Sequence, residues 1–309
     1  MAGLALPVLE PATLDEALAA LADESTSAKV IAGGTRVTLL MRQRLLSADR
    51  LVALHRLPLA SLAEQDGMVS IGALATHAQI AASALVNAHY PALASAFARV
   101  ASPRIRNMGT IGGNLVHGEP HLDPPVALLA AGATLTVRSL GAEREIAIDN
   151  FFIGFSETAL LPTEVLTSVR IPPRSAGEGL SFIKHLARSR HDQATVDVSV
   201  WLAISGDGRI EGARIAIGGA GPTVFRAREA EALLRGKPLE GQAASAAGDA
   251  AASLAEPAGD TRGAAEYKRQ LIRVLVPRAV DLALQDAARP SGGSSAPVPA
   301  SGFHDRALG

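Results

Sequence analysis

Hydrophobic and polar positions recur with two different periods along this chain, which predicts a mixture of helices and strands. In the first third, the pattern predicts helices at residues 13–22, 37–45, 77–86 and 90–101, and strands at 29–32, 50–57 and 68–76. Thr13 followed by Glu16 is typical of a capping box at the first helix. The pair Gly33-Gly34 follows the first strand, so the expected order there is helix, strand, tight turn, helix.

The later pattern predicts strands at residues 133–137, 145–148, 164–172, 181–187, 195–205 and 209–219, and helices at 225–236, 241–255 and 265–287. A turn at 207–209 joins the last two strands as a hairpin. The stretch PPRSAGEG at 172–179 interrupts the pattern and indicates a boundary between domains at 1–173 and 178–287. Residues 289–309 are rich in Ser, Gly, Pro and Ala, so we expect a disordered tail.

Composition removes several classes of protein. The chain has 309 residues, of which 48% are hydrophobic, so it can build a sizeable core. A net charge of −1 and 3% aromatic residues argue against a nucleic-acid partner. We see no secretory signal and expect no membrane span. Cysteine is absent, which excludes disulfides and cysteine-ligated iron–sulfur clusters and fits a reducing compartment. We therefore expect a cytoplasmic location.

Two glycine-rich segments, AGGT at 32–35 and GTIGGN at 109–114, are the first candidates for a site. Neither matches GxGxxG or GxxxxGK[ST], the common dinucleotide and phosphate-loop patterns. Both are interpreted here as turns, and successive backbone N–H groups in such turns can converge on an anion. Arg104 and Arg106 lie just upstream of the second segment and add positive charge. Taken singly, each segment is equally typical of an ordinary turn.

Two polar segments leave alternatives open. In HGEPHLD, the residues His117, Glu119, His121 and Asp123 alternate, so an extended chain would point them one way, as in a metal site. An intervening glycine and proline favour a solvated loop instead, and we expect no metal. The stretch KHLARSRHDQ at 184–193 is either a hairpin loop in water or a loop that covers a ligand. Hydrolase patterns such as GxSxG and HExxH are missing.

Six segments together resemble one family. They are VIAGGTRVTLLMR, RNMGTIGGNLVHGEPHLDPPVALLAAGATLTV, DNFFIGF, EVLTSVRIP, SFIKHLARS and IAIGGAGPTVFRAREAEALLRGKPL, in this order. The chain resembles, over roughly residues 5–287, the medium, FAD-binding subunit of molybdenum hydroxylases of the carbon monoxide dehydrogenase and xanthine dehydrogenase type. The resemblance implies an α+β fold: a PCMH-type (vanillyl-alcohol oxidase-like) FAD-binding domain of two subdomains, then a C-terminal domain with a small antiparallel sheet and helices.

The resemblance also implies which residues bind FAD without a covalent bond. The first segment, 30–37, would wrap the pyrophosphate, and 110–114 would run between the pyrophosphate and the flavin end. Asp123 would face the adenosine half, where a carboxylate suits a ribose hydroxyl. Lys184 would lie near the flavin and stabilise its anionic reduced form. The full set is Val30, Ile31, Ala32, Gly33, Gly34, Thr35, Arg36, Val37, Val100, Thr110, Ile111, Gly112, Gly113, Asn114, Asp123, Leu166 and Lys184, with Val100 and Leu166 as apolar contacts.

Four positions depart from the family pattern. Arg36 and Val37 stand where relatives often carry Asp, Ser or Gln. His121 lies in a segment where relatives have small residues and a second acid. Gln193 replaces an aromatic or bulky apolar residue near the flavin face, which leaves open how the ring is shielded.

The implied function is electron transfer within a complex. A large molybdopterin subunit and a small subunit with [2Fe-2S] clusters are the expected partners, in a dimer of heterotrimers, and the FAD of this chain passes electrons to an acceptor. No catalytic side chain is needed. The substrate stays open among carbon monoxide, purines, nicotine-like heterocycles, aldehydes and acyl thioesters, and the acceptor among NAD, quinone, a cytochrome or oxygen. The alternatives are a free-standing FAD-dependent oxidoreductase and a scaffold subunit without flavin.

Overall fold

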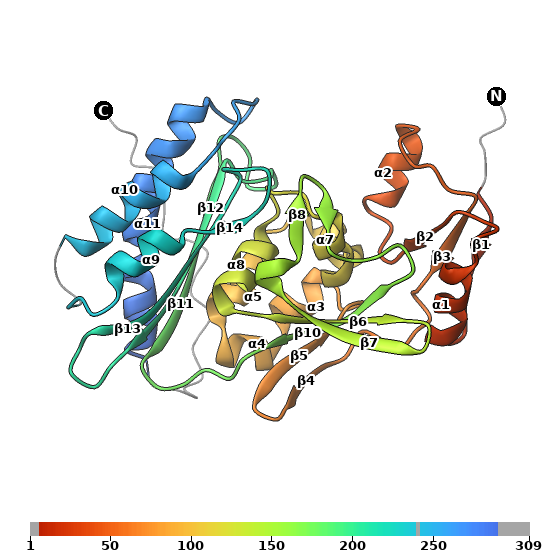
Figure 1. Ribbon diagram of the computed structural model, residues 1–309, viewed down its shortest axis with the longest axis horizontal. Coiled ribbons are helices and arrows are strands. Elements are labelled where there is room, and N and C mark those ends of the chain that lie inside the picture. Colours follow the sequence, from red (N-terminus) through yellow and green to blue (C-terminus); the bar gives the residue numbers. More distant parts are fainter. Residues whose placement is uncertain (1–5, 239–241, 290–309) are drawn as a thin grey trace.

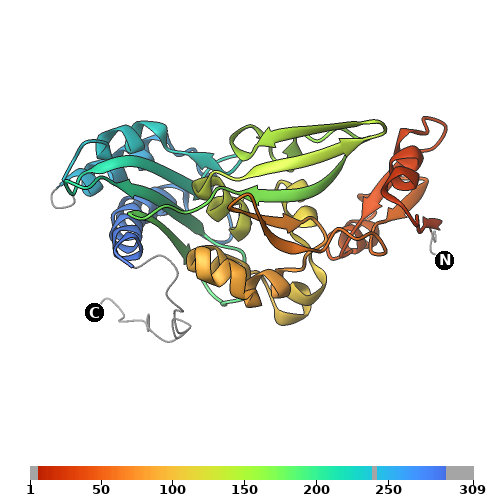
Figure 2. The same ribbon diagram turned by 90° about the horizontal axis from the view of Figure 1, so that it is seen from below.

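The structure is a computed structural model that describes residues 6–238 and 242–289. The described N-terminal residues lie at one end of an elongated molecule and the C-terminal sheet lies at the other (Figures 1 and 2). A small parallel sheet has the order β1-β3-β2 and comprises β1 (Val8–Leu9), β2 (Ala28–Ile31) and β3 (Arg50–Ala53). Helix α1 (Leu14–Ala22) contacts β2 and β3, and α2 (Val37–Arg42) follows the first glycine segment. Thr13 caps α1 through Glu16 N, as predicted, although the Glu16 carboxylate accepts from Ala12 N.

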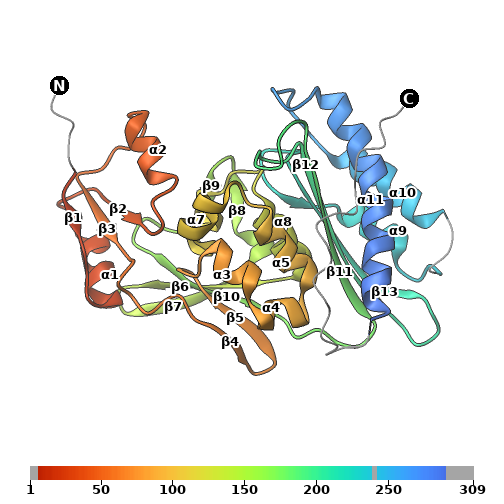
Figure 3. The ribbon, with the colours of Figure 1, turned by 180° about the vertical axis from the view of Figure 1, so that it is seen from behind.

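The second unit is built on an antiparallel sheet of order β4-β5-β10-β6-β7. Its strands are β4 (Leu62–Gln65), β5 (Met68–Gly72), β6 (Thr134–Ser139), β7 (Ala142–Ala147) and β10 (Val165–Ile171). The helices are α3 (His77–Ala82), α4 (Ala84–His89), α5 (Pro91–Ala98), α6 (Pro103–Met108), α7 (Ile111–His117) and α8 (Asp123–Ala131). A short hairpin of β8 (Phe152–Gly154) and β9 (Glu157–Thr158) lies beside α7 (Figure 3). All of these helices except α6, which has no buried residue, share one apolar core with the sheet.

The C-terminal unit is an antiparallel sheet of order β11-β12-β13-β14 with three helices. Its strands are β11 (Glu178–His185), β12 (Val196–Ile204), β13 (Ile210–Gly218) and β14 (Phe225–Arg226). Helices α9 (Arg228–Leu234) and α11 (Ala265–Ala287) pack on this sheet, and α10 (Ala243–Leu254) packs on these two helices. The sheet also contacts α5 and α8 of the second unit. The predicted hairpin at 207–209 is confirmed, because β12 pairs with β13 and Ser205 N donates to Arg209 O at 2.9 Å.

Several sequence predictions need correction. The helix predicted at 77–86 is divided at Ser83, whose hydroxyl caps α4 through Val86 N. Segment 109–114 is not a turn: Thr110 accepts from Gly113 N and starts α7, so Gly112 and Gly113 lie in the first helical turn. Helices α6 and α8 were not predicted. In α8 the two prolines obscured the pattern, yet they occupy the first turn, where their missing N–H groups have no helical partner anyway.

Two further expectations concern the tail and membrane-spanning helices. The predicted tail at 289–309 lies, apart from Arg289, outside the described residues. Among the helices that the structure describes, none has both the length and the apolar composition needed to cross a membrane.

Candidate functional site

The two glycine segments contact each other through their backbones. A Cβ atom on Gly33 would lie 1.8 Å from the carbonyl oxygen of Met108, so only glycine permits this approach. On the other side of the second segment, a Cβ on Gly112 would lie 2.8 Å from Ala73. Two segments more than 70 residues apart are thus brought into one place, which we call the glycine-segment site (residues 30–37 and 110–114).

The first segment leaves backbone donors unused. Within the described residues, no N–H group from Gly33 to Arg36 donates to a protein acceptor, whereas the carbonyl groups of Gly34 and Arg36 accept from Thr38 N and Leu40 N. These residues are half-buried. Consecutive free N–H groups in a partly enclosed backbone are the feature that binds phosphate oxygens.

Two buried polar atoms at the site also lack partners among the described residues. They are Nε of Arg36, from the first segment, and Oδ1 of Asn114, from the second. Such atoms normally have a hydrogen-bond partner, so each has an unused hydrogen-bonding position that a bound ligand could fill. Arg36 also acts on the end of α7. The pKa of His117 is lowered by burial and then by the charge of Arg36. The free amides and the Arg36 guanidinium are donors that fit an anionic dinucleotide such as FAD, and Asn114 Oδ1 is an acceptor for a hydroxyl or N–H group of the same ligand.

Arg106 holds the chain beside the site. Its guanidinium donates to the carbonyl oxygens of Val100 at 2.8 Å and Ala101 at 2.7 Å. Val100 is consequently fixed in a buried position, while Arg104 is exposed. Arg106 therefore acts here on the backbone of the predicted contact residue Val100.

His77 supports the second segment from behind. The His77 ring packs against Gly109, since a Cβ atom added to Gly109 would lie 3.0 Å from Cδ2 of the ring. The backbone N–H of His77 donates to Gly109 O at 3.0 Å. Burial, helped by the charge of Arg106, lowers the pKa of His77 to about 4. The ring is therefore neutral at pH 7. Sequence analysis missed this residue, because a histidine at the start of an apolar helix carries no distinct signal.

Asp123 and Lys184 form a buried ion pair between the second unit and the C-terminal sheet. The Lys184 ammonium donates to Asp123 Oδ2 at 2.9 Å and to Arg99 O at 3.1 Å. The Lys184 side chain is 1% exposed and the Asp123 side chain is 5% exposed. Their predicted contacts, with the flavin and with the adenosine half, stay predictions. Leu166 is a core residue of β10 and is also buried.

A polar network connects the loop between α7 and α8 to the C-terminal unit. His121 Nδ1 lies 2.7 Å from Glu119 Oε1, and its Nε2 lies 3.5 Å from Asp260 Oδ2. Gln193 donates to Glu119 Oε2 at 2.7 Å and accepts from Arg262. The departures at His121 and Gln193 thus meet in one network.

The metal alternative for HGEPHLD is not supported by the geometry. His117 ends α7 and Asp123 begins α8, so the segment is not the extended strand in which the four side chains would share a face. In the part of the chain that the structure describes, no group of three or more His, Cys, Asp or Glu side chains is placed to hold a metal ion.

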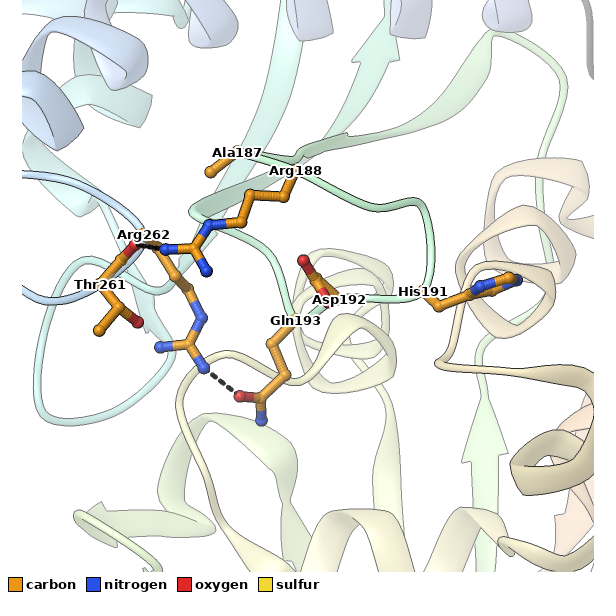
Figure 4. A pocket seen from close by; sticks show the side chains of 7 residues that line it. All are labelled: Ala187, Arg188, His191, Asp192, Gln193, Thr261 and Arg262. Carbon is orange, nitrogen blue, oxygen red and sulfur yellow. Dashed lines mark hydrogen bonds between the residues drawn. The ribbon is translucent and has the colours of Figure 1, made fainter.

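The loop at 186–193 lines a polar cavity of about 360 Å³ next to this network (Figure 4). Arg188 donates to Thr261 O at 2.8 Å, and the Arg262 guanidinium is hydrogen-bonded to Gln193. The lining residues are Ala187, Arg188, His191, Asp192, Gln193, Thr261 and Arg262. The loop therefore does more than connect β11 to β12, since it contributes one wall of a cavity.

Comparison with known proteins decides the family. Residues 4–174 match the model of the FAD binding domain in molybdopterin dehydrogenase, and residues 181–283 match that of the CO dehydrogenase flavoprotein C-terminal domain. This chain belongs to the family of FAD-binding medium subunits of molybdenum hydroxylases. The fold class predicted from the sequence is thereby confirmed, as are the oxidoreductase class and FAD as the cofactor of the domain.

The relatives cover nearly the whole chain. The medium chain of carbon monoxide dehydrogenase from Hydrogenophaga pseudoflava is 34% identical over 88% of this chain and 95% of its own length. The alpha subunit of the 6-hydroxypseudooxynicotine dehydrogenase complex from Paenarthrobacter nicotinovorans is 35% identical over 89% and 93%. The solved carbon monoxide dehydrogenase from H. pseudoflava matches with a TM-score of 0.89 and 35% identity, covering 93% of this medium subunit and 100% of that chain.

Proposed function

We propose that this medium subunit binds FAD without a covalent bond at the glycine-segment site and passes electrons from the iron–sulfur clusters of a small partner subunit to an external acceptor. The observation that carries the proposal is the glycine-segment site itself. Gly33 packs against Met108 O, and around this contact lie free N–H groups together with the unpartnered atoms of Arg36 and Asn114. The residues proposed for FAD are the seventeen assigned by the family resemblance, from Val30 to Lys184.

Some described groups at the site can reach a ligand, and some also hold the chain in place around it. The free amides from Gly33 to Arg36 would bind phosphate oxygens, and Asn114 would bind from the second segment. Arg106 and Lys184 hold the backbone at Val100 and Arg99, so they orient the chain at the proposed apolar contact. When bound, FAD supplies the redox chemistry, and no side chain of this subunit has to act as a nucleophile or base.

The proposal includes a complex. The chain contains no cysteine, so [2Fe-2S] clusters would belong to a partner subunit, and the two family matches, both to flavoprotein domains, support a further partner for the molybdopterin. The names of relatives, such as the nicotine 6-hydroxylase medium subunit, support large and small partners. A dimer of heterotrimers and a cytoplasmic location are part of the same proposal. The alternative of a free-standing oxidoreductase predicts that the isolated chain oxidises a substrate with multiple turnovers.

The decisive experiment uses the complex purified with its partners. Addition of the substrate of the large subunit should bleach the absorbance of bound flavin, after reduction of the iron–sulfur centres. If the iron–sulfur centres become reduced while the flavin stays oxidised, electron transfer through this subunit is wrong. A preparation without bound flavin would support the alternative of a scaffold subunit.

A charge substitution tests the location of the cofactor. Asn114→Asp keeps the unpartnered oxygen but removes the amide donor and adds a negative charge that repels the diphosphate, so it should weaken FAD binding by about 1–3 kcal/mol, roughly 5- to 150-fold in Kd. Gln65→Glu is the matched control, since it makes the same chemical change on an exposed residue of β4. Titration of the flavin-free complex with FAD gives both constants. Equal Kd values for the two variants would place FAD elsewhere.

A further inference from the structure

Two carboxyl groups and one ammonium group are buried together where the second unit meets the C-terminal sheet. Asp197 on β12 is the cross-strand partner of Lys184 on β11, and Asp123 begins α8. Asp197 is 0% exposed and Asp123 is 4% exposed. We call these three residues the carboxyl–lysine cluster. With both acids ionised it would carry a net negative charge in a dry environment, which is costly.

Hydrogen bonding within the cluster is incomplete if both acids are ionised. Lys184 is used by Asp123 Oδ2 and by Arg99 O. In the described structure, Asp123 Oδ1 and both oxygens of Asp197 have no N–H or O–H donor. The two carboxyl groups are nevertheless close, since Asp123 accepts from Lys184 at 2.9 Å, Asp197 lies opposite Lys184 on the neighbouring strand, and each acid affects the pKa of the other. Two carboxylates only accept hydrogen bonds, so this contact is favourable only when one of them carries a proton.

The surroundings decide which acid carries it. Asp123 contacts the Lys184 ammonium at 2.9 Å, which favours its ionised form. Asp197 has no such contact. Burial, and then the neighbouring charge of Asp123, raise the pKa of Asp197 well above its ordinary value, and Lys184 and Arg99 only partly oppose this. The charged groups that face Asp197 are thus Asp123 on α8, Lys184 on β11 and Arg99 after α5.

We propose that Asp197 is a positioning residue that stays protonated at neutral pH and donates its proton to Asp123 Oδ1. Asp123 then offers Oδ2 to Lys184, and the cluster has one positive and one negative charge. The arrangement fixes the start of α8 on the C-terminal sheet and keeps Lys184 on Arg99 O, next to Val100. Its relevance to FAD rests on the proposed function, but the protonation itself does not.

The first test is the pH dependence of unfolding of the full chain. Above pH about 4, unfolded Asp197 releases a proton that the folded chain retains. Rising pH therefore destabilises the wild type relative to Asp197→Asn, by up to about tenfold in the unfolding constant per pH unit, until the folded Asp197 titrates. Asp281→Asn, on an exposed residue of α11, is the control and should show no such trend. A gap between wild type and D197N that does not change with pH would overturn the proposal.

An infrared measurement does not depend on stability. The wild type should show the C=O stretching band of a protonated carboxyl group at neutral pH, and D197N should lack it. Absence of the band from the wild type would overturn the proposal. If D197N does not fold, Asp197→Ser keeps a smaller donor toward Asp123 and serves for the same comparison.

A flavin measurement separates this inference from the proposed function. FAD content should fall in the wild type at alkaline pH, when Asp197 ionises, and should persist in D197N. Loss of FAD with the same pH dependence in both proteins would contradict the positioning role. If no preparation contains FAD at any pH, the proposed function is wrong, while the unfolding and infrared results still decide the protonation of Asp197.

Discussion

The glycine-segment site and the carboxyl–lysine cluster solve opposite problems. The first is half-buried, is made chiefly of backbone, and keeps donors and acceptors without protein partners. The second is fully buried, is made of side chains from α8, β11 and β12, and pairs its two carboxyl groups internally once a single proton is counted. The difference teaches that unpartnered polar atoms mark a ligand site only after internal protonation has been considered, because Asn114 and Asp197 look alike in a simple inventory.

Removal of the cation should have the largest effect. Lys184→Met leaves Asp123 buried without its ion-pair partner and should destabilise the chain by about 3–5 kcal/mol. Lys237→Met alters an exposed lysine and should change the free energy of unfolding by less than about 0.5 kcal/mol. Urea unfolding at neutral pH measures both. Wild-type stability in K184M would show that the ion pair contributes nothing, and the contrast between the two regions would be lost.

The backbone contact should come next. Gly33→Ala forces the two segments apart, because the new Cβ would lie 1.8 Å from Met108 O. The variant should lower the free energy of unfolding by about 1–3 kcal/mol and should lose bound flavin. Gly206→Ala has open space around its Cβ and serves as the control. Thermal unfolding and the flavin-to-protein ratio report the two effects. Full flavin content in G33A would contradict a site that depends on this contact.

Acid should also act on the glycine-segment site, through His77. The folded pKa of His77, about 4, lies below its ordinary 6.5, so the unfolded chain binds the extra proton between these values. Stability is therefore lost as pH falls below 6.5, by up to about tenfold in the unfolding constant per unit, until the folded ring titrates near pH 4. His77→Gln should flatten this dependence, whereas His55→Gln, on an exposed residue, should leave it unchanged. Unfolding curves between pH 4 and 7 decide the matter.

Local signals predicted much of the fold. Helix 265–287 was predicted with the bounds it has, since a long amphipathic stretch stands between clear ends, and the 207–209 hairpin follows from its turn residues. The segment at 109–114 was misjudged because its glycines obscured the helix that Thr110 starts. Glycines that look like turn formers in sequence here serve contacts with Met108 and Ala73.

The site was predictable in part, and through the family resemblance more than through pattern. The two glycine segments were named, but their contact depends on packing between distant parts of the chain. Asp123 and Lys184 were assigned to a cofactor, and their pairing could not be derived across 61 residues. Asp197 is the instructive omission: one acid in the apolar run TVDVSVWLAIS was a visible anomaly, yet its partners come from another strand and a helix of another unit.

The position of Asp123 at the start of α8 has a practical consequence for hybrid proteins. A subunit assembled from the front half of this chain and the rear half of a relative would join Asp123 to foreign residues at 184 and 197. If the relative has other residues at positions 184 and 197, such a hybrid would bury the charge of Asp123 without a partner. Positions 123, 184 and 197 should therefore be transferred together. The segment at 172–179 is a convenient place to join two halves in sequence. Substitutions at position 123, before it, and at positions 184 and 197, after it, nevertheless affect one another.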